Sequence, residues 1–308
     1  MRRTIVALVG ATATGKTALG EAVAERAGGE VVCADARQVF RELEIGTGKP
    51  TPAERAARPH HLFDWLALGE RPTAGGWARA AAAACEACFA RGTLPVLVGG
   101  SGLYLDALQR GLHPEPPKDE DVRTRLADEC ERSGVEAMHA RLAGLDPDAG
   151  RALKPRDRQR VLRALEVVEV SGHTLGWWRE HARDAPLAAE WRAFQLVVEP
   201  GVLRARIAER TEAMWRDGLL DETAALIAAG KAEALERLAA IGYDEAMDVL
   251  AGRSTPDAAK QAMSVRTAQL AKRQRTWFRH QLSSTALEMS RDALAPFLID
   301  QILEAVGG

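Results

Sequence analysis

A glycine-rich segment near the N-terminus constrains the fold of this 308-residue chain more than any other feature. The segment Gly10-Ala11-Thr12-Ala13-Thr14-Gly15-Lys16-Thr17 satisfies the pattern G-x-x-x-x-G-K-[ST]. It follows a short apolar run, Ile5 to Val9, and precedes a helical spacing of apolar residues at Leu19, Ala22 and Val23. A strand, a glycine turn and a helix in this order direct backbone N–H groups toward a bound phosphate. The segment therefore predicts a loop that binds a diphosphate or a nucleotide.

Two side chains of this loop add chemistry to its backbone. Lys16 supplies positive charge to the terminal phosphates, and the hydroxyl of Thr17 is a natural ligand for Mg²⁺. We therefore expect Mg²⁺ as a cofactor, held at Thr17. The loop alone does not name the reaction, because nucleotide hydrolysis, phosphoryl transfer and pyrophosphate displacement all use such a loop.

The segments that follow alternate between strand and helix patterns. Apolar runs at Val31–Ala34 and Pro95–Gly99 flank an Ala-rich helix at 77–91, which predicts an α/β fold with a doubly wound parallel sheet of the P-loop NTPase type. A proline-rich hinge, His113 to Pro117, begins an all-helical insertion. We expect a core of residues 1–112 and 190–308 and an insertion at 113–189. The core should contain a further strand at Phe194–Val198 and end in helices at 201–229, 231–251, 255–283 and 293–306, with Thr255 as the N-cap of the third.

Composition narrows the class of protein. With 41 Lys plus Arg, 43 Asp plus Glu and a net charge of −2, the chain is not a uniformly basic nucleic-acid coat. A hydrophobic share of 46% and a charged share of 27% exclude extended disorder. Because the sequence has no apolar run of about 18 to 20 residues, we expect a cytoplasmic protein without a membrane partner.

Asp35 and Arg210 are the candidate reactive residues outside the loop. Asp35 ends the second predicted strand, so it should face the same crevice as the loop and could serve as a general base, or it could only cap the next turn. Arg210 lies on an apolar helix stripe with Leu203, Ile207 and Met214. A guanidinium there needs an anionic partner, which could be a bound pyrophosphate or a structural carboxylate.

Two predicted helices carry cationic faces. Arg156, Arg160 and Arg163 share one face of the first, and Lys272, Arg275 and Arg279 share one face of the second, next to Trp277 and Phe278. Either face could be merely solvated, but two in a near-neutral chain favour a polyanionic partner, with nucleic acid the leading candidate. The two aromatic residues are expected in the core.

Two other patterns suggest metal sites, and we favour a structural explanation for both. Cys85 and Cys88 form a C-x-x-C inside an Ala-rich helix, where buried cysteines are the simpler interpretation. The adjacent His60 and His61 lie on an extended segment and so point in opposite directions, which is poor for chelation. We expect them to have a structural or substrate-lining role.

Taken together, eight segments resemble the tRNA dimethylallyltransferase (tRNA isopentenyltransferase) family, of the short bacterial type. They occur in the family's order and span nearly the whole chain. They are Gly10–Thr17, Ala34–Phe40, Ile45–Thr51, Pro59–Asp64, Val98–Leu105, Asp157–Glu166, Ala240–Glu245 and Ala271–Arg279.

The resemblance implies an activity and roles for individual residues. A dimethylallyl group would move from dimethylallyl diphosphate to the exocyclic N6 of the adenine immediately 3′ of a tRNA anticodon. The catalytic residues would be Asp35 as base, Arg210 on the pyrophosphate and Thr12 near the bridging oxygen. The resemblance also implies a monomer and a helical insertion that holds the anticodon stem-loop. The residues along the tRNA path would be Asp35, Ala36, Arg37, Gln38, Ser101, Arg123, Gln159, Arg160, Val161, Leu162 and Arg163.

The chain departs from the family pattern without losing a charged or catalytic group. Ala11 and Thr14 replace the usual proline and serine of the loop, and Ser101 replaces a threonine. Three further departures follow Asp35: a serine is replaced by Ala36, a methionine by Arg37 and a tyrosine by Phe40. The loss of the serine hydroxyl puts a tRNA hydrogen bond at position 36 in question. Three alternatives stay open: an adenylate isopentenyltransferase, a small-metabolite P-loop kinase and a non-catalytic RNA-binding protein.

Overall fold

The first apolar run forms β1 (Thr4–Gly10), whose residues are all buried at the centre of a parallel sheet. The computed structural model describes residues 3–111, 118–181, 185–289 and 296–307. The six strands follow the order β3-β2-β4-β1-β5-β6 and all pair in parallel. The other strands are β2 (Glu30–Cys33), β3 (His60–His61), β4 (Pro95–Gly99), β5 (Glu190–Val197) and β6 (Thr285–Glu288).

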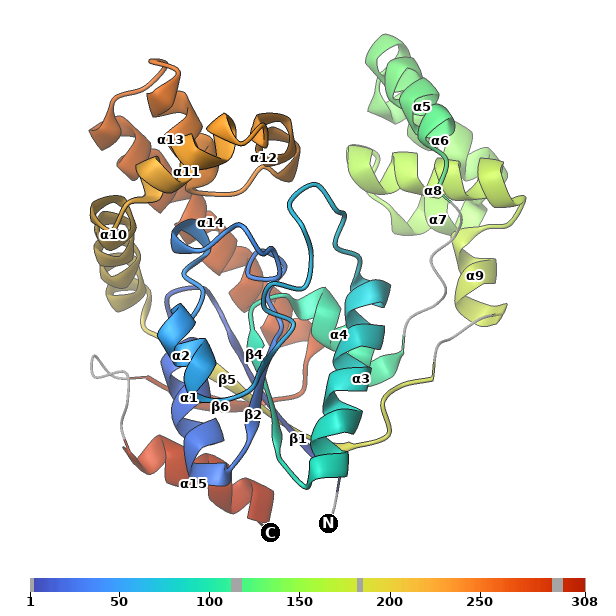
Figure 1. Cartoon of the computed structure of the whole chain (residues 1–308). Coiled ribbons are helices and arrows are strands. Elements are labelled where there is room, and N and C mark those ends of the chain that lie inside the picture. The colour runs from blue at the N-terminus through green and yellow to red at the C-terminus, as the bar shows by residue number, and fades with distance from the viewer. Residues whose placement is uncertain (1–2, 112–117, 182–184, 290–295, 308) are drawn as a thin grey trace. The chain divides into compact units, whose positions relative to one another are not determined.

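Alternate residues of β1 build two separate cores. Ile5, Ala7 and Val9 pack in a cluster with α3 (Ala74–Arg91) and α4 (Gly102–Arg110). Val6 and Leu8 pack in a cluster with α1 (Lys16–Ala27) and α15 (Pro296–Gly307). Figure 1 shows these helix pairs on the two sides of the sheet. The predicted α/β fold with a doubly wound parallel sheet is confirmed.

The chain divides into two compact units. Unit 1 contains residues 1–109 and 187–308, and unit 2 contains residues 110–186. The sequence placed these boundaries at 112 and 190, and the predicted hinge at 113–117 lies outside the described residues. In unit 1, η1 (Ile45–Thr47) and α2 (Pro52–Ala57) connect β2 to β3.

The described residues of unit 2 form helices without strands, around a core that includes Leu126, Met138, Leu142, Val161 and Leu165. The helices are α5 (Glu120–Ser133), α6 (Val135–Leu145), α7 (Pro147–Ala152), α8 (Arg158–Ser171) and α9 (Leu175–His181).

The C-terminal helices are shorter than the sequence predicts. A left-handed Gly218 separates α10 (Pro200–Arg216) from α11 (Leu219–Ala228), so the predicted helix 201–229 is wrong as a single element. Left-handed Ala239 likewise ends α12 (Ala232–Leu238) before α13 (Tyr243–Leu250). The predicted helix 255–283 is confirmed as α14 (Pro256–Gln281), and Thr255 caps it by accepting from the Ala258 N–H. The predicted start of the last helix at 293 lies outside the described residues.

None of the described helices combines the length and the apolar character that crossing a bilayer requires.

Candidate functional site

The loop between β1 and α1 has the backbone that a phosphate-binding turn needs. Gly10 and Gly15 adopt φ angles of 146° and 94°, and a Cβ at Gly10 would approach the Leu196 carbonyl to 2.8 Å. No side chain caps the first turn of α1, which begins at Lys16. The unpaired N–H groups of that turn are therefore available to an anion.

Lys16 folds back over this loop, and its Nζ donates to the Ala11 carbonyl at 2.5 Å. Burial lowers the pKa of Lys16 to about 8, Asp35 opposes this decrease, and Arg210 adds to it. The two candidate reactive residues are thus both close enough to act on the loop lysine. A bound diphosphate would stabilise the positive charge that burial disfavours.

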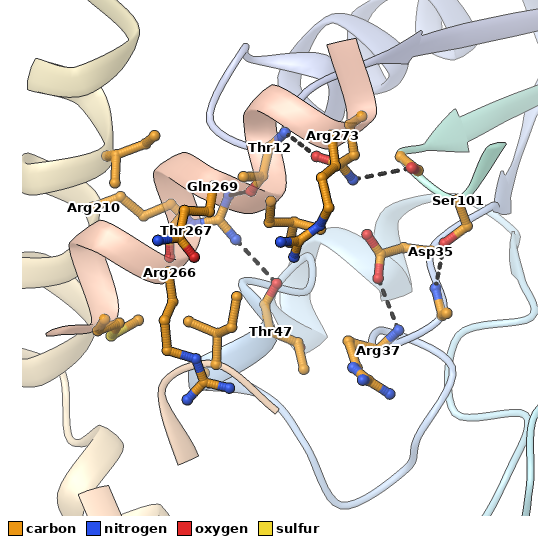
Figure 2. Close-up of a pocket in the computed structure, with 18 of the residues that line it drawn as sticks. Thr12, Asp35, Arg37, Thr47, Ser101, Arg210, Arg266, Thr267, Gln269 and Arg273 are labelled. Atoms are coloured by element: carbon orange, nitrogen blue, oxygen red, sulfur yellow. Dashed lines mark hydrogen bonds between the residues drawn. The ribbon is translucent and has the colours of Figure 1, made fainter. Parts of the chain in front are cut away.

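Asp35 follows β2 and combines the two roles that the sequence left open. Its Oδ1 accepts from the N–H groups of Arg37 at 2.8 Å and Gln38 at 3.4 Å, so it does cap the next turn. Asp35 also lines a cavity (Figure 2). Ser101, after β4, fixes the same segment by accepting from the Ala36 N–H at 2.9 Å.

Arg210 reaches the cavity from α10. Leu203, Ile207 and Met214 are buried along its stripe, as predicted. Its Nη2 donates to the Thr47 carbonyl at 3.0 Å and its Nη1 to the Thr12 hydroxyl at 3.5 Å. No described carboxylate forms an ion pair with Arg210, and burial lowers its pKa while Asp35 opposes that decrease. The structural-carboxylate explanation therefore has no partner among the described residues, which favours an anionic ligand.

Asp35, Thr12 and Arg210 meet at one cavity of about 640 Å³, although they come from three distant segments. Ala36, Arg37 and Ser101 also line it, whereas Gln38 turns away and donates to the carbonyls of Thr47 and Gly48. Part of the wall is apolar, formed by Ile207, Met214, Ala239, Ile241, Met263 and Leu270. The cavity can thus hold a charged group and a hydrocarbon group side by side.

The contribution of α14 to this cavity is not predicted by the sequence patterns above. Arg266, Arg273 and Gln274 line it from one helix face. The side chain of Gln274 accepts from the Thr12 N–H at 2.8 Å and donates to the Gly100 carbonyl at 3.0 Å, so it links the loop to the end of β4. The spacing of Met263, Arg266, Leu270 and Gln274 was the available signal.

Unit 2 holds the remaining residues that the resemblance assigned to tRNA. Gln159 and Arg160 are exposed on α8, and Arg160 pairs with Asp157 at 2.9 Å. Arg123 and Arg163 instead bind the buried Glu166 at 2.9 and 2.7 Å. Burial raises the pKa of Glu166, but Arg163 and Arg123 outweigh burial and hold this pKa below its usual value.

Two predicted tRNA residues of α8 have apolar surroundings. Val161 is fully buried in the core of unit 2, so its side chain is not available to a ligand, and Leu162 packs against the same core. The helix period explains this placement, because one face of α8 must pack while the other meets solvent.

The residues that suggested metal sites have structural partners. Cys85 and Cys88 are buried in α3 as free thiols. His60 pairs with Glu21 at 2.5 Å and His61 with Glu30 at 2.6 Å. Glu30, His61 and Cys88 do cluster, but Arg91 binds both oxygens of Glu30, so a cation already fills the position beside that carboxylate.

The architecture and the cavity can be compared with those of known proteins. The fold and cavity define an α/β protein with a glycine-rich loop before its first helix and a helical unit inserted between strands. The family model described as IPP transferase matches residues 38–281, and the chain belongs to this family.

Individual relatives match nearly end to end. The chain is 43% identical over 282 residues to the tRNA dimethylallyltransferase of Rhodopseudomonas palustris (strain BisB18), covering 90% of this chain and 88% of that protein. It is 38% identical to the enzyme of the same name from Geobacter metallireducens, covering 99% and 96%. The solved tRNA isopentenylpyrophosphate transferase of Bacillus halodurans superposes with a TM-score of 0.71 at 33% identity, covering 100% and 96% of the two chains.

Proposed function

We propose that this protein transfers a dimethylallyl group from dimethylallyl diphosphate to the exocyclic N6 of the adenine immediately 3′ of a tRNA anticodon, releasing pyrophosphate. Relatives named tRNA dimethylallyltransferase match this chain over most of their length. One observation carries the proposal for this chain. Asp35, Thr12 and Arg210 line a single cavity next to the phosphate-binding turn, and that cavity also has an apolar wall.

The diphosphate would bind where the cationic groups gather. The first turn of α1, Lys16 and Arg210 provide N–H donors and positive charge for its oxygens. Thr12 donates its backbone N–H to Gln274 and its hydroxyl oxygen accepts from Arg210, so its position near the bridging oxygen would be fixed from two sides. Charge that develops on the leaving pyrophosphate as the allylic C–O bond breaks would be stabilised there.

The loop also suits Mg²⁺. Mg²⁺ is commonly held by one or two protein oxygens and by substrate phosphates, and Thr17, in the first turn of α1, offers one such oxygen. When bound, the ion would neutralise charge on the diphosphate.

Asp35 would act as the base for the adenine amine that accepts the dimethylallyl group. The exocyclic amine of adenine is a weak nucleophile because its lone pair is delocalised into the ring. As the N–C bond forms and the C–O bond breaks, the amine loses a proton, which the Asp35 carboxylate accepts. An adenine inside an RNA stack cannot reach this cavity, so the base must leave its stack first.

The test is incubation of the purified protein with Mg²⁺, dimethylallyl diphosphate and either unmodified tRNA or AMP, followed by nucleoside mass spectrometry and pyrophosphate measurement. We expect dimethylallyladenosine from tRNA alone, with one pyrophosphate per transfer. Modification of AMP alone would assign a mononucleotide enzyme. In a separate incubation with ATP and a small alcohol, formation of ADP would assign a kinase. Stable tRNA binding with no turnover would assign a non-catalytic RNA-binding protein.

A further inference from the structure

Tyr104 lines the cavity, and the mechanism above does not use its hydroxyl. Tyr104 lies in the first turn of α4, directly after β4, and is part of the cavity wall. The residue is only 5% exposed, and its hydroxyl oxygen is buried without a hydrogen-bond partner among the described residues. Because a buried hydroxyl without a partner is unfavourable, such a group in a binding cavity indicates a partner that arrives with the ligand.

Stacking fixes the ring that carries this hydroxyl, and a hydrogen bond fixes its stacking partner. Tyr104 stacks on Trp77, with ring centroids 4.8 Å apart and planes inclined by 15°. Trp77 is fully buried, and its Nε1 donates to the Cys33 carbonyl at 2.8 Å. Cys33 ends β2, two residues before Asp35. The hydroxyl is therefore held in a defined position relative to the proposed base.

Burial and a nearby carboxylate keep the Tyr104 hydroxyl protonated, so it remains a hydrogen-bond donor. Burial raises its pKa, and the negative charge of Asp35 raises it further. The phenol thus stays protonated beside a carboxylate that accepts.

We propose that Tyr104 is a specificity-determining residue whose hydroxyl donates to a ring nitrogen of the acceptor adenine. This inference rests on the proposed function. Tyr104 as donor and Asp35 as acceptor match adenine, which presents ring-nitrogen acceptors beside an amine donor. Guanine presents a carbonyl in place of that amine and would face Asp35 with an acceptor.

The experiment compares anticodon stem-loop RNAs that carry adenosine, 1-deazaadenosine, 3-deazaadenosine or 7-deazaadenosine at the target position. Each deaza analogue lacks one ring nitrogen. We expect Tyr104→Phe to lower kcat/KM for the adenosine RNA by about ten-fold or more, with the KM for dimethylallyl diphosphate unchanged. One analogue should lower the kcat/KM of the wild-type enzyme by a similar factor. On that analogue, Tyr104→Phe should lower kcat/KM little further.

Tyr243→Phe is the matched control, since Tyr243 is the other of the two tyrosines in the sequence. Its hydroxyl donates to Glu222, so its loss should combine additively with every analogue. An unchanged kcat/KM for Tyr104→Phe, additivity on all three analogues, or full wild-type activity on all three would each overturn the inference while leaving the proposed function intact. No wild-type transfer to the adenosine RNA would overturn the proposed function, and the inference with it.

Discussion

At the scale of single residues, Asp35 combines a structural and a chemical role in one carboxylate. Its Oδ1 accepts from two backbone N–H groups of the following turn, which orients the side chain at the cavity. An asparagine can keep these hydrogen bonds through its side-chain oxygen but cannot accept the proton.

We therefore predict that Asp35→Asn lowers kcat by about 10²-fold or more while tRNA affinity and thermal stability stay near wild type. Single-turnover transfer, filter binding and thermal unfolding measure the three quantities. Asp35→Ala is the comparison, since it also loses the turn contacts and should be less stable. Undiminished turnover of Asp35→Asn would remove Asp35 from the role of base.

Arg210 has a backbone carbonyl and a hydroxyl as its partners, and both belong to residues that line the cavity. We predict that Arg210→Ala raises the KM for dimethylallyl diphosphate and lowers kcat, with a smaller change in tRNA affinity, because it removes charge from the leaving group's site. Steady-state kinetics with each substrate varied in turn separates these effects. Weakened tRNA binding with normal use of the diphosphate would make Arg210 a contact for RNA instead.

At the scale of elements, the turn η1 and the glycine after it hold Arg210 in place. Gly48 has a φ of 59°, and a Cβ there would lie 2.2 Å from Arg210 Nη2. Gly48→Ala should therefore reproduce the diphosphate defect of Arg210→Ala and also lose stability.

Gly252→Ala controls for backbone strain alone. Gly252 has a φ of 69° with no atom within 4 Å of the added carbon, so its variant should lose stability but keep wild-type kinetics. Equal kinetics of the Gly48 and Gly252 variants would contradict the role of this turn.

Glu30 connects β2 to the end of α3. Hydrogen bonds from Arg91 lower the pKa of Glu30 to about 2, and Thr93 and His61 contribute. A carboxylate with a lowered folded-state pKa stabilises the fold above its ordinary pKa of 4.5, and this stabilisation is lost as the pH falls from 4.5 toward 2.

We predict that Glu30→Gln lowers the free energy of unfolding by about 3 kcal/mol at neutral pH. The difference from wild type should shrink as the pH falls through that window. Urea unfolding as a function of pH provides the measurement, and a difference that is independent of pH would contradict this assignment.

The elements show where local sequence sufficed and where it did not. The strand-loop-helix at Gly10–Thr17 and the cap at Thr255 depend on neighbouring residues, and both appear at their predicted places. The break at Ala239 depends on a left-handed alanine, which no propensity predicts. The α14 wall of the cavity depends on contacts between Gln274 and residues more than 170 positions away, which periodicity alone does not specify.

At the scale of the whole molecule, four arginines of unit 2 differ in what they bind. Arg123 and Arg163 are held by Glu166, whereas Arg156 and Arg160 have side chains that are 88% and 74% exposed. The exposed pair can exchange its weak surface ion pairs for RNA phosphates at little cost.

An Arg156→Ala/Arg160→Ala variant should therefore bind tRNA with a shallower dependence of log affinity on log salt concentration. The charge-matched control is Arg216→Ala/Arg253→Ala, which removes two exposed arginines from unit 1. Identical slopes for the first variant and the wild type would show that these two arginines of unit 2 are merely solvated.

The proposed reaction is tested most directly by locating the transferred group in the tRNA. Unmodified tRNA, reacted with dimethylallyl diphosphate and Mg²⁺ in the presence of this protein, is cleaved with a base-specific ribonuclease and its fragments are sequenced by mass spectrometry. The proposed reaction predicts the dimethylallyl group on the adenosine immediately 3′ of the anticodon and on no other nucleoside. A group on any other nucleoside, or no modified fragment, would contradict it.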